Sequence, residues 1–114
     1  MNIRSATVQD AGRWDAYVLG HPQGTFSHRF GWKRIIENTY GHAGHYLLAE
    51  QEGELRGVLP LGQVKRLLFG HSLISVPFCV AGGVLADSSQ VQRALEEAAT
   101  DLARQLGVDY LEVR

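Results

Sequence analysis

The chain has 114 residues and a formal net charge of −1. This length suits one domain, and it is long enough to bury a core without disulfide or metal support. The near balance of charges excludes the strongly basic surface that is typical of a nucleic-acid-binding domain. Cys79 is the one cysteine, so an internal disulfide is excluded and a reducing compartment is indicated.

The first ten residues are polar and lack the apolar centre of a signal peptide. No apolar run approaches the length of about 18 residues that a membrane-spanning helix needs. We therefore expect a cytoplasmic protein without a membrane span.

The chain is expected to open with a short strand over residues 2–6 and a helix. Thr7 and Asp10 have the spacing of a helix-start box, with aspartate in place of the usual glutamate. Gly20 is suited to end the helix, and His21-Pro22 prevents its continuation.

A second helix is predicted to begin at Ser27 and to stop at Gly41. Gly31 would then lie inside it, at a cost of about 1 kcal/mol relative to alanine. The large aromatic residues of these two helices are expected in the core: Trp14, Trp32 and Tyr40.

Two apolar runs on either side of residues 51–54 predict a hairpin with a Glu-Gly turn. Pro60 cannot donate a ladder hydrogen bond, so it predicts a bulge or an unpaired edge. A further strand is expected over residues 73–80, broken at Pro77.

Residues 81–87 form a glycine-containing connection to the clearest helix of the chain, which Ser88 or Ser89 would cap. Apolar residues recur through this helix at a spacing of 3.6 residues, and Gly107 ends it. A strand over residues 108–114 follows, so the helix is long enough to cross over between two parallel strands. The predicted class is α/β (α+β), with helices packed on a mixed sheet and the order β-α-α-β-β-β-α-β.

That order and several local motifs resemble the FemAB family of acyl- and aminoacyltransferases, which has the GNAT fold. The branch that the chain resembles most is associated with exosortase/PEP-CTERM exopolysaccharide systems. The motifs, in chain order, are His21-Pro22-Gln23-Gly24-Thr25, Trp32, Gly57-Val58-Leu59-Pro60-Leu61, Phe69-Gly70, Leu73-Ile74-Ser75-Val76-Pro77-Phe78, Gly82-Gly83 and Tyr110-Leu111-Glu112-Val113-Arg114.

Family members are longer and have two GNAT-like lobes with a substrate cleft between them. The resemblance therefore implies that residues 1–114 are one GNAT-like domain, the N-terminal part of a longer transferase, inactive alone. The full protein would move an acyl or aminoacyl group to an amine of a cell-envelope or exopolysaccharide precursor. Its partners would be an aminoacyl-tRNA or other acyl donor and a sugar-linked acceptor.

The alternative enzyme is a small CoA-dependent N-acetyltransferase. GNAT enzymes hold the pyrophosphate of acetyl-CoA on backbone amides before a helix, at an Arg/Gln-x-x-Gly-x-Gly/Ala sequence. Residues 80–89 contain glycines without that spacing, and Asp87 would place a negative charge beside the pyrophosphate. No cofactor is therefore expected, and acetyl-CoA is disfavoured.

The resemblance implies that basic residues near Trp32 meet the phosphates of a nucleotide-linked acceptor. Lys33 and Arg34 are the candidates, with Lys65 and Arg66 in a similar role, and the alternative is that all four only solvate the surface. Further residues of the implied cleft wall are Ser75, Phe78, Gly82 and Gly83.

No catalytic residue is identified. His42 and His45 have no third ligand nearby for zinc, and the other histidines are expected to be structural or exposed: His21, His28 and His71. Cys79 is expected to be a buried inert thiol, because nothing near it in the sequence would lower its pKa. Glu112 on the last strand is either a general base of the full enzyme or a solvent-facing residue.

A third interpretation is a non-catalytic domain that forms a homodimer. The last strand would lie at a sheet edge, and exposed edges recruit other strands. The acyl donor, the acceptor and the natural length of the protein are left open by the sequence.

Overall fold

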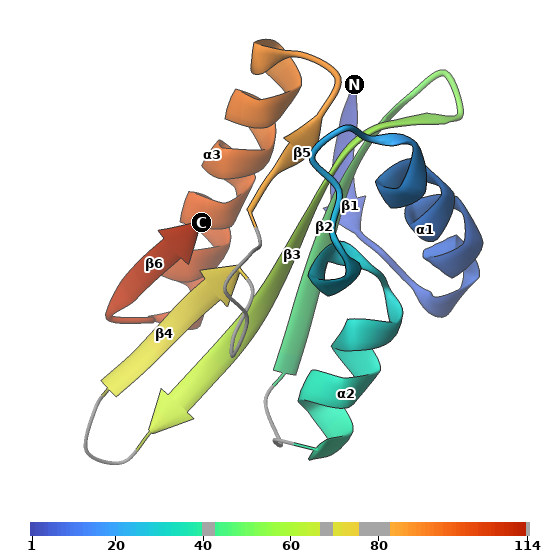
Figure 1. The fold of residues 1–114 in the computed structure, drawn as a ribbon. Helices are drawn as coiled ribbons and strands as arrows, with labels where there is room; N and C mark the ends of the chain where they lie inside the picture. The colour runs from blue at the N-terminus through green and yellow to red at the C-terminus, as the bar shows by residue number, and fades with distance from the viewer. Residues whose placement is uncertain (40–42, 67–69, 76–82, 114) are drawn as a thin grey trace.

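The computed structural model describes residues 1–39, 43–66, 70–75 and 83–113. Helices cover both faces of one mixed sheet, with α1 and α2 on one face and α3 on the other (Figure 1). The elements in chain order are β1 (Asn2–Ser5), η1 (Val8–Asp10), α1 (Ala11–Gly20), η2 (Phe26–His28), α2 (Gly31–Thr39), β2 (Ala43–Gln51), β3 (Glu54–Arg66), β4 (Gly70–Ser75), β5 (Leu85–Ala86), α3 (Ser89–Leu106) and β6 (Tyr110–Val113).

The strands run in the order β1-β2-β3-β4-β6, and β5 pairs with β3 beside this path. All pairings are antiparallel except that of β4 with β6, which is parallel. A parallel pair requires a crossover, and α3 supplies it. The predicted α/β class with a mixed sheet is confirmed, and the two-residue strand β5 is an addition to the predicted order.

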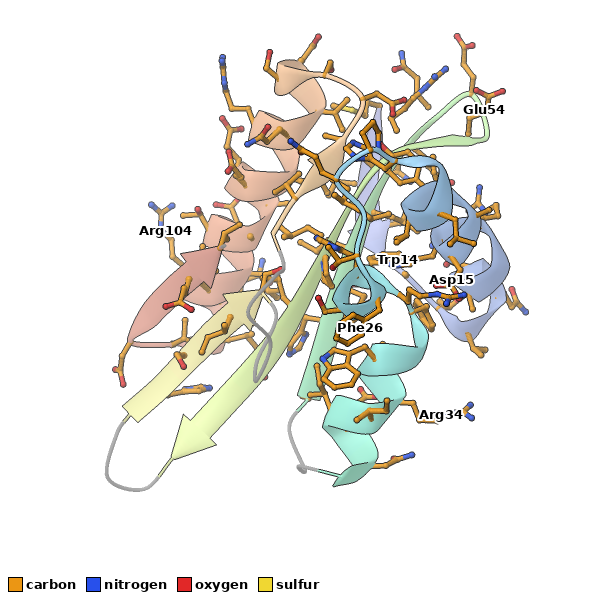
Figure 2. The ribbon with its side chains drawn as sticks, in the orientation of Figure 1. Trp14, Asp15, Phe26, Arg34, Glu54 and Arg104 are labelled. Carbon is orange, nitrogen blue, oxygen red and sulfur yellow. The ribbon has the colours of Figure 1, made fainter. Side chains whose placement is uncertain are left out.

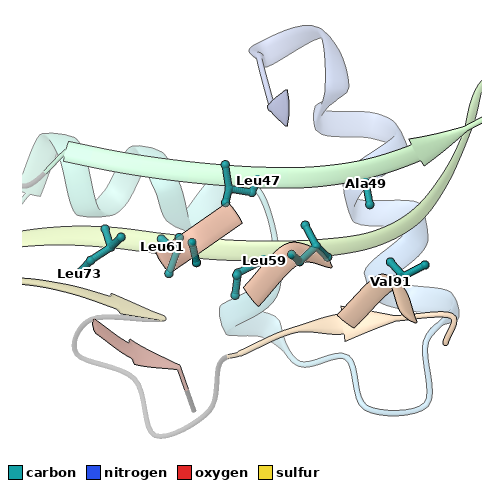
Figure 3. Close-up of a cluster of buried hydrophobic side chains, with 8 residues drawn as sticks. Leu47, Ala49, Leu59, Leu61, Leu73 and Val91 are labelled. Carbon is teal, nitrogen blue, oxygen red and sulfur yellow. The ribbon is translucent and has the colours of Figure 1, made fainter. Parts of the chain in front are cut away.

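The face of the sheet under α3 carries the larger apolar cluster (Figure 3). Alternate residues of β2 and β3 point to this face, because side chains of a strand alternate between its two sides. They pack against the first turns of α3, and the buried members are Leu47, Ala49, Leu59, Leu61, Leu73, Val91, Leu95 and Ala99. The 3.6-residue spacing that predicts α3 thus corresponds to its buried side.

The opposite face is covered by α1, by α2 and by the segment between them. Trp14 is fully buried there, stacked on Tyr46 with 5.1 Å between ring centroids. Its indole N–H donates to the backbone oxygen of His28 at 2.6 Å. The expectation that Trp14 lies in the core is confirmed, whereas Trp32 is only partly buried and Tyr40 lies outside the described residues.

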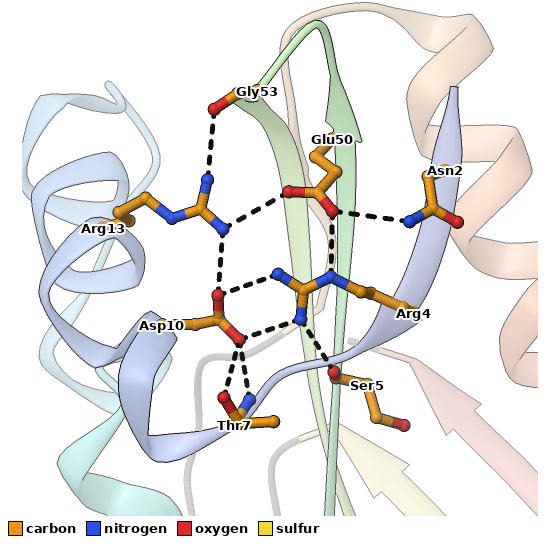
Figure 4. A network of polar contacts seen from close by, with 8 residues as sticks. All are labelled: Asn2, Arg4, Ser5, Thr7, Asp10, Arg13, Glu50 and Gly53. Carbon is orange, nitrogen blue, oxygen red and sulfur yellow. Dashed lines mark hydrogen bonds and ion pairs between the residues drawn. The ribbon is translucent and has the colours of Figure 1, made fainter.

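A polar network joins β1, α1 and the end of β2 (Figure 4). Arg4 donates from both Nη atoms to the two carboxylate oxygens of Asp10, at 2.9 Å each. Arg13 also donates to Asp10 and reaches Glu50, while the Thr7 N–H donates to Asp10 at 2.8 Å. The Thr7–Asp10 box is confirmed, and its carboxylate additionally fixes the first strand to the first helix.

The second helix differs from its prediction. Phe26–His28 form a single 3₁₀ turn, the chain is extended at Arg29, and α2 begins at Gly31. The Phe30 N–H is held by Asp15 of α1 at 2.8 Å, which redirects the chain before the helix. Gly31 is therefore the first residue of α2 and not a costly interior one, and Gly41 lies outside the described residues.

Pro60 is not at the bulge of β3, but it lies where no described strand pairs with one side of β3, which agrees with the predicted unpaired edge. It lies opposite Tyr46 in β3, which is central, and the register shift falls between Ala49 and Glu50. A proline is tolerated there because β3 changes neighbour, from β5 at Val58 to β4 at Gly62. The predicted strand over residues 73–80 is described as β4 only up to Ser75, and Pro77 lies outside the described residues.

In the described part of the chain, no helix is long and apolar enough to cross a membrane.

Candidate functional site

The sheet divides where β4 and β5 both reach β3. The N-terminal part of β3 pairs with β5 at Gly57 and Val58, and its C-terminal part pairs with β4 from Gly62 onward. The parallel strands β4 and β6 end at this level, with Ser75 opposite Val113. Open α/β sheets bind ligands beyond the carboxyl ends of their parallel strands, so a ligand site is expected at this division.

A cavity of about 450 Å³ lies at this division. It is bordered by η2 and its preceding loop, the segment before α3, the first turns of α3 and the end of β6, and it is open to solvent at the exposed side chains of Gln23, Gln92 and Glu96. The residues that line it are Gln23, His28, Val84, Leu85, Gln92, Glu96 and Val113. We call it the split cavity.

His28 is the buried polar residue of the split cavity, with 2 % of its surface exposed. Its Nδ1 accepts the Thr25 N–H at 3.1 Å and lies 2.8 Å from Thr25 Oγ1. Because a backbone N–H can only donate, Nδ1 must be an acceptor, and a neutral His28 carries its hydrogen on Nε2. The 3₁₀ turn thus fixes both the position and the tautomer of this ring.

Gln92 and Glu96 form the polar wall that faces η2. They are four residues apart on α3, which places them on one side of the helix. The Val91 and Leu95 side chains are buried in the sheet, so this pair lies beside the buried stripe and borders the cavity.

The connection that leads into α3 is held by side chains of α1 and its following loop. The Tyr17 hydroxyl lies 2.7 Å from Asp87 Oδ1 and 2.9 Å from the Arg56 backbone oxygen. Burial, and then the Asp87 carboxylate, raise the pKa of Tyr17. His21 accepts the Gln23 N–H at Nδ1, so its Nε2–H donates to the Ala86 oxygen at 3.1 Å.

This hydrogen bonding gives a structural role to the His21-Pro22-Gln23 motif. His21 ties its own loop to β5, and the same loop then supplies Gln23 to the split cavity. A more open hollow of about 570 Å³ lies on the outer side of the loop, against Tyr17 and Asp87.

The N-terminus of α3 carries its own cap. Ser88 is extended and its hydroxyl accepts the Val91 N–H at 3.3 Å. Asp87 precedes it, 3.7 Å from the Arg56 guanidinium. Val91 of this turn and Leu95 of the next are packed close to β3, where a Cβ on Gly57 would lie 2.7 Å from Val91 Cγ1 and 2.9 Å from Leu95 Cδ1.

Of the predicted cleft-wall residues, the structure joins Ser75 and Gly83. Gly83 has a positive φ of 95°, which favours glycine, and its N–H donates to the buried Ser75 hydroxyl at 3.0 Å. This bond joins the last residue of β4 to the segment that leads into β5. Phe78 and Gly82 lie outside the described residues, as does Cys79.

Lys33 and Arg34 border a different cavity. It measures about 440 Å³ and lies between η1, the start of α1 and α2. Lys33 is paired with Glu37 at 3.0 Å, and Arg34 points away from the sheet (Figure 2). The backbones of Lys65 and Arg66 end β3, and their side chains lie outside the described part of the structure. These basic residues are therefore not brought together with Ser75 and Gly83.

The described residues hold no group of three His, Cys, Asp or Glu side chains that could bind a metal ion. His45 and His71 lie instead at the two ends of a chain through Gln63, at 2.8 and 2.7 Å, and His42 falls outside the described residues.

The sequence does not predict that His28 and α3 border one cavity. His28 is a structural residue of its own turn, as one of its two expected roles requires, and Glu96 is exposed. The i, i+4 pairing of Gln92 with Glu96 beside the apolar stripe was the available signal, but only the fold reveals that η2 faces it.

No protein-family model matches the chain, and no curated protein matches it either. Among solved structures, it is similar to FemX, at 21% identity and a TM-score of 0.67 over 92% of this chain. It spans 25% of the FemX chain, about a quarter of that protein's length.

It is also similar to a ribosomal-protein-alanine N-acetyltransferase from Brucella melitensis biovar Abortus 2308, at 14% identity and a TM-score of 0.70. That match covers all of this chain and 80% of the other. The apo aminoglycoside antibiotic 6'-N-acetyltransferase from Acinetobacter haemolyticus matches at 16% identity and a TM-score of 0.67, over 100% of this chain and 79% of its own. These likenesses establish the fold alone: the chain has the GNAT-like α/β fold that its order of elements predicts.

Proposed function

We propose that this chain is the first part of a FemAB-type transferase. The complete protein would transfer an acyl or aminoacyl group to an amine of a cell-envelope or exopolysaccharide precursor. In that reaction the amine nitrogen attacks the carbonyl carbon of the donor ester, a C–N bond forms, the C–O bond breaks, and the proton of the amine passes to the departing oxygen. Positioning the ester beside the amine supplies much of the rate enhancement.

One observation carries the choice of donor. At the N-terminus of α3 the Val91 N–H already donates to the Ser88 hydroxyl, and the Asp87 carboxylate precedes the helix. A pyrophosphate there would find that N–H occupied and a negative charge beside it. Anion binding at a helix N-terminus needs free N–H groups and a favourable field. This arrangement favours a donor that does not dock through the pyrophosphate of CoA.

The likeness to FemX supports the same choice. That match includes 92% of this chain but only 25% of the FemX chain, which is the coverage expected for one part of a longer transferase. We accordingly expect no transfer activity from the 114-residue chain alone, because one wall of the cleft would come from a second lobe.

Lys33 and Arg34 remain candidates for contacts to a phosphate of the acceptor. Their cavity between α1 and α2 is separate from the split cavity, so they would hold a remote part of a long acceptor. The Lys33–Glu37 pair would have to open, or be shared, for Lys33 to take that role.

A small CoA-dependent N-acetyltransferase is the second candidate, because the chain covers 80% and 79% of two solved structures of proteins named N-acetyltransferases. Calorimetric titration with CoA separates the two functions. A FemAB-type lobe should give no heat of binding, and a saturable heat at micromolar CoA would overturn the first proposal.

A homodimer through the sheet edge is a third, non-catalytic candidate. Within the described residues β4 is the one strand that pairs with β6, which leaves the outer side of β6 available. Light scattering over a range of concentrations tests it, and a constant monomer mass counts against it.

A further inference from the structure

We infer that His45, Gln63 and His71 form a pH-sensitive clamp that holds one added proton and opens when a second is added. The three side chains come from three neighbouring strands, β2, β3 and β4. We call them the histidine row. The inference is independent of the proposed transferase activity, because it rests on hydrogen bonds outside the split cavity.

The histidine row lies on the face of the sheet that α3 covers. Each member is two residues away from a buried leucine of its own strand, and side chains two residues apart on a strand share a face. These leucines belong to the larger apolar cluster: Leu47, Leu61 and Leu73. The members of the row are themselves partly exposed. The row is therefore a polar border of the apolar cluster that can exchange protons with water.

The carboxamide of Gln63 bonds to both imidazole rings. Its Oε1 lies 2.8 Å from His45 Nε2, and its Nε2 lies 2.7 Å from His71 Nε2. An amide oxygen accepts a hydrogen bond, and an amide N–H donates one. His45 therefore carries a hydrogen on Nε2, whereas His71 accepts at Nε2 and carries its hydrogen on Nδ1 when neutral. One amide thus fixes opposite tautomers for the two rings.

The histidine row has room for one imidazolium. An imidazolium donates from both ring nitrogens, so it can face only the oxygen end of the amide. A proton added to His45 leaves both bonds in place, because that ring already donates to Oε1. A proton added to His71 is accommodated when the amide turns over and His45 changes its tautomer. With two imidazoliums, one of them faces the amide N–H, and that bond is lost.

Two charged residues face His71 and act in opposite directions. Asp109, in the turn before β6, accepts the backbone N–H of His71 at 2.8 Å and favours a cation there. Lys65 is the residue of β3 opposite His71 in the register of the sheet, and a lysine at that position opposes a cation. These charges influence which ring takes the first proton. They do not change the number of donors that the amide can face.

The other elements beside the row direct their charges elsewhere. Leu61 of β3 lies opposite His45, and Glu112 of β6 pairs with Ile74, whose side chain is on the other face of the sheet. Lys33 and Glu37 of α2 contact the sheet at Gly44, also on that other face. The charged residues of α3 are all exposed: Arg93, Glu96, Glu97, Asp101 and Arg104.

Acidification therefore weakens the fold at the histidine row. Histidine side chains gain their charge between about pH 8 and pH 5. Both rings can be protonated in the unfolded chain, whereas the intact row holds one added proton. Stability falls with falling pH wherever the unfolded state binds more protons. In this range the link between Gln63 and one neighbouring strand should open, above the pH of about 4 at which unfolded aspartates such as Asp10 become protonated.

The test follows the ring signals of His45 and His71 by NMR from about pH 8 to about pH 5. In the parent chain the two rings should take up protons in two separate steps. Gln63→Leu removes the amide, so the two steps should move together. Gln90→Leu is the control, because Gln90 is an exposed glutamine in the first turn of α3, and it should behave as the parent does. A single common step in the parent, or unchanged steps in Gln63→Leu, would overturn the inference.

Gln63→Glu is the second variant, with nearly the same side-chain shape. A carboxylate accepts at both oxygens, so it can bond to two imidazoliums at once. Between about pH 7.5 and about pH 5.5, where histidine gains its charge, the melting temperatures of the parent and of Gln90→Leu should fall, and that of Gln63→Glu should rise. An equal fall in the parent and in Gln63→Glu would contradict the clamp, whether or not Gln63→Leu folds.

Discussion

The hydroxyl of Tyr17 lies 2.7 Å from Oδ1 of Asp87, across 70 residues of sequence. It also lies 2.9 Å from the backbone oxygen of Arg56, so its one hydrogen serves two acceptors. Burial, followed by the effect of the Asp87 carboxylate, raises the pKa of Tyr17, and the hydroxyl therefore stays a donor. Tyr17 thus joins α1 to β3 and to the segment before α3.

Tyr17→Phe should lower the free energy of unfolding by about 1 kcal/mol, the net worth of a hydrogen bond with a charged acceptor that is partly exposed. Urea unfolding at pH 7 measures it. The same change in an Asp87→Asn background should cost less, because the charged acceptor is gone. Equal costs in both backgrounds would show that Tyr17 contributes through packing alone.

Helix α3 and the hairpin of β2 and β3 could be predicted from the sequence because their signals are local. The apolar spacing of α3, its serine cap and Gly107 at its end all lie within twenty consecutive residues, and all three are present in the structure. Gly107 has a φ of 67°, the left-handed conformation that ends a helix. The Glu-Gly hairpin was equally accessible, since Glu52 and Gly53 both have positive φ.

The features that form the split cavity could not be predicted, because they depend on distant partners. Strand β5 has two residues and exists by pairing with Gly57 and Val58 of β3. The turn at His28 replaces the expected start of a helix because Asp15 of α1 holds the Phe30 N–H. Neither partner can be identified from the local sequence.

Gly57→Ala should destabilise the fold by about 1–3 kcal/mol, the usual cost of overpacking a core. The new Cβ would lie 2.7 Å from Val91 Cγ1, 2.9 Å from Leu95 Cδ1 and 3.0 Å from the Leu85 oxygen. Thermal unfolding followed by circular dichroism measures the change. A melting temperature equal to that of the parent would mean that α3 does not approach β3 as closely as described.

Gly12→Ala is the control for that substitution. Gly12 lies in α1 with nothing within 4 Å of its built Cβ, so alanine should raise stability by up to about 1 kcal/mol through helix propensity. The two changes are chemically identical, and opposite signs would isolate the effect of the close contact.

Asp10→Asn should lower stability at pH 7 by about 1–2 kcal/mol, because it removes a charged acceptor held by Arg4, Arg13 and Thr7. Hydrogen bonds from Arg4 chiefly, with those from Thr7 and Arg13, hold the pKa of Asp10 well below its usual range. A carboxyl with a lowered pKa in the folded state gives stability that is present above its unfolded pKa of about 4 and is lost as the pH falls below it.

The variant should therefore lose less stability than the parent on acidification from about pH 5 to pH 2, so that the two profiles converge. Urea unfolding at four pH values within this range measures both profiles. Glu97→Gln on the exposed side of α3 is the control, and it should leave the difference between neutral and acid stability unchanged. Parallel profiles for Asp10→Asn and the parent would contradict the assignment of the acid sensitivity to Asp10.

Ser88→Ala should cost about 1 kcal/mol, and Ser88→Gly only a few tenths, because glycine is tolerated at a helix N-cap and alanine is not. The loss should be local: the Val91 N–H, which donates to the Ser88 hydroxyl at 3.3 Å, should exchange with solvent faster in both variants. CoA should still give no heat of binding to Ser88→Ala, because Asp87 keeps its negative charge at the exposed amides. Binding of CoA to Ser88→Ala but not to the parent would show that the serine cap alone, and not the aspartate, closes this end of α3 to phosphate.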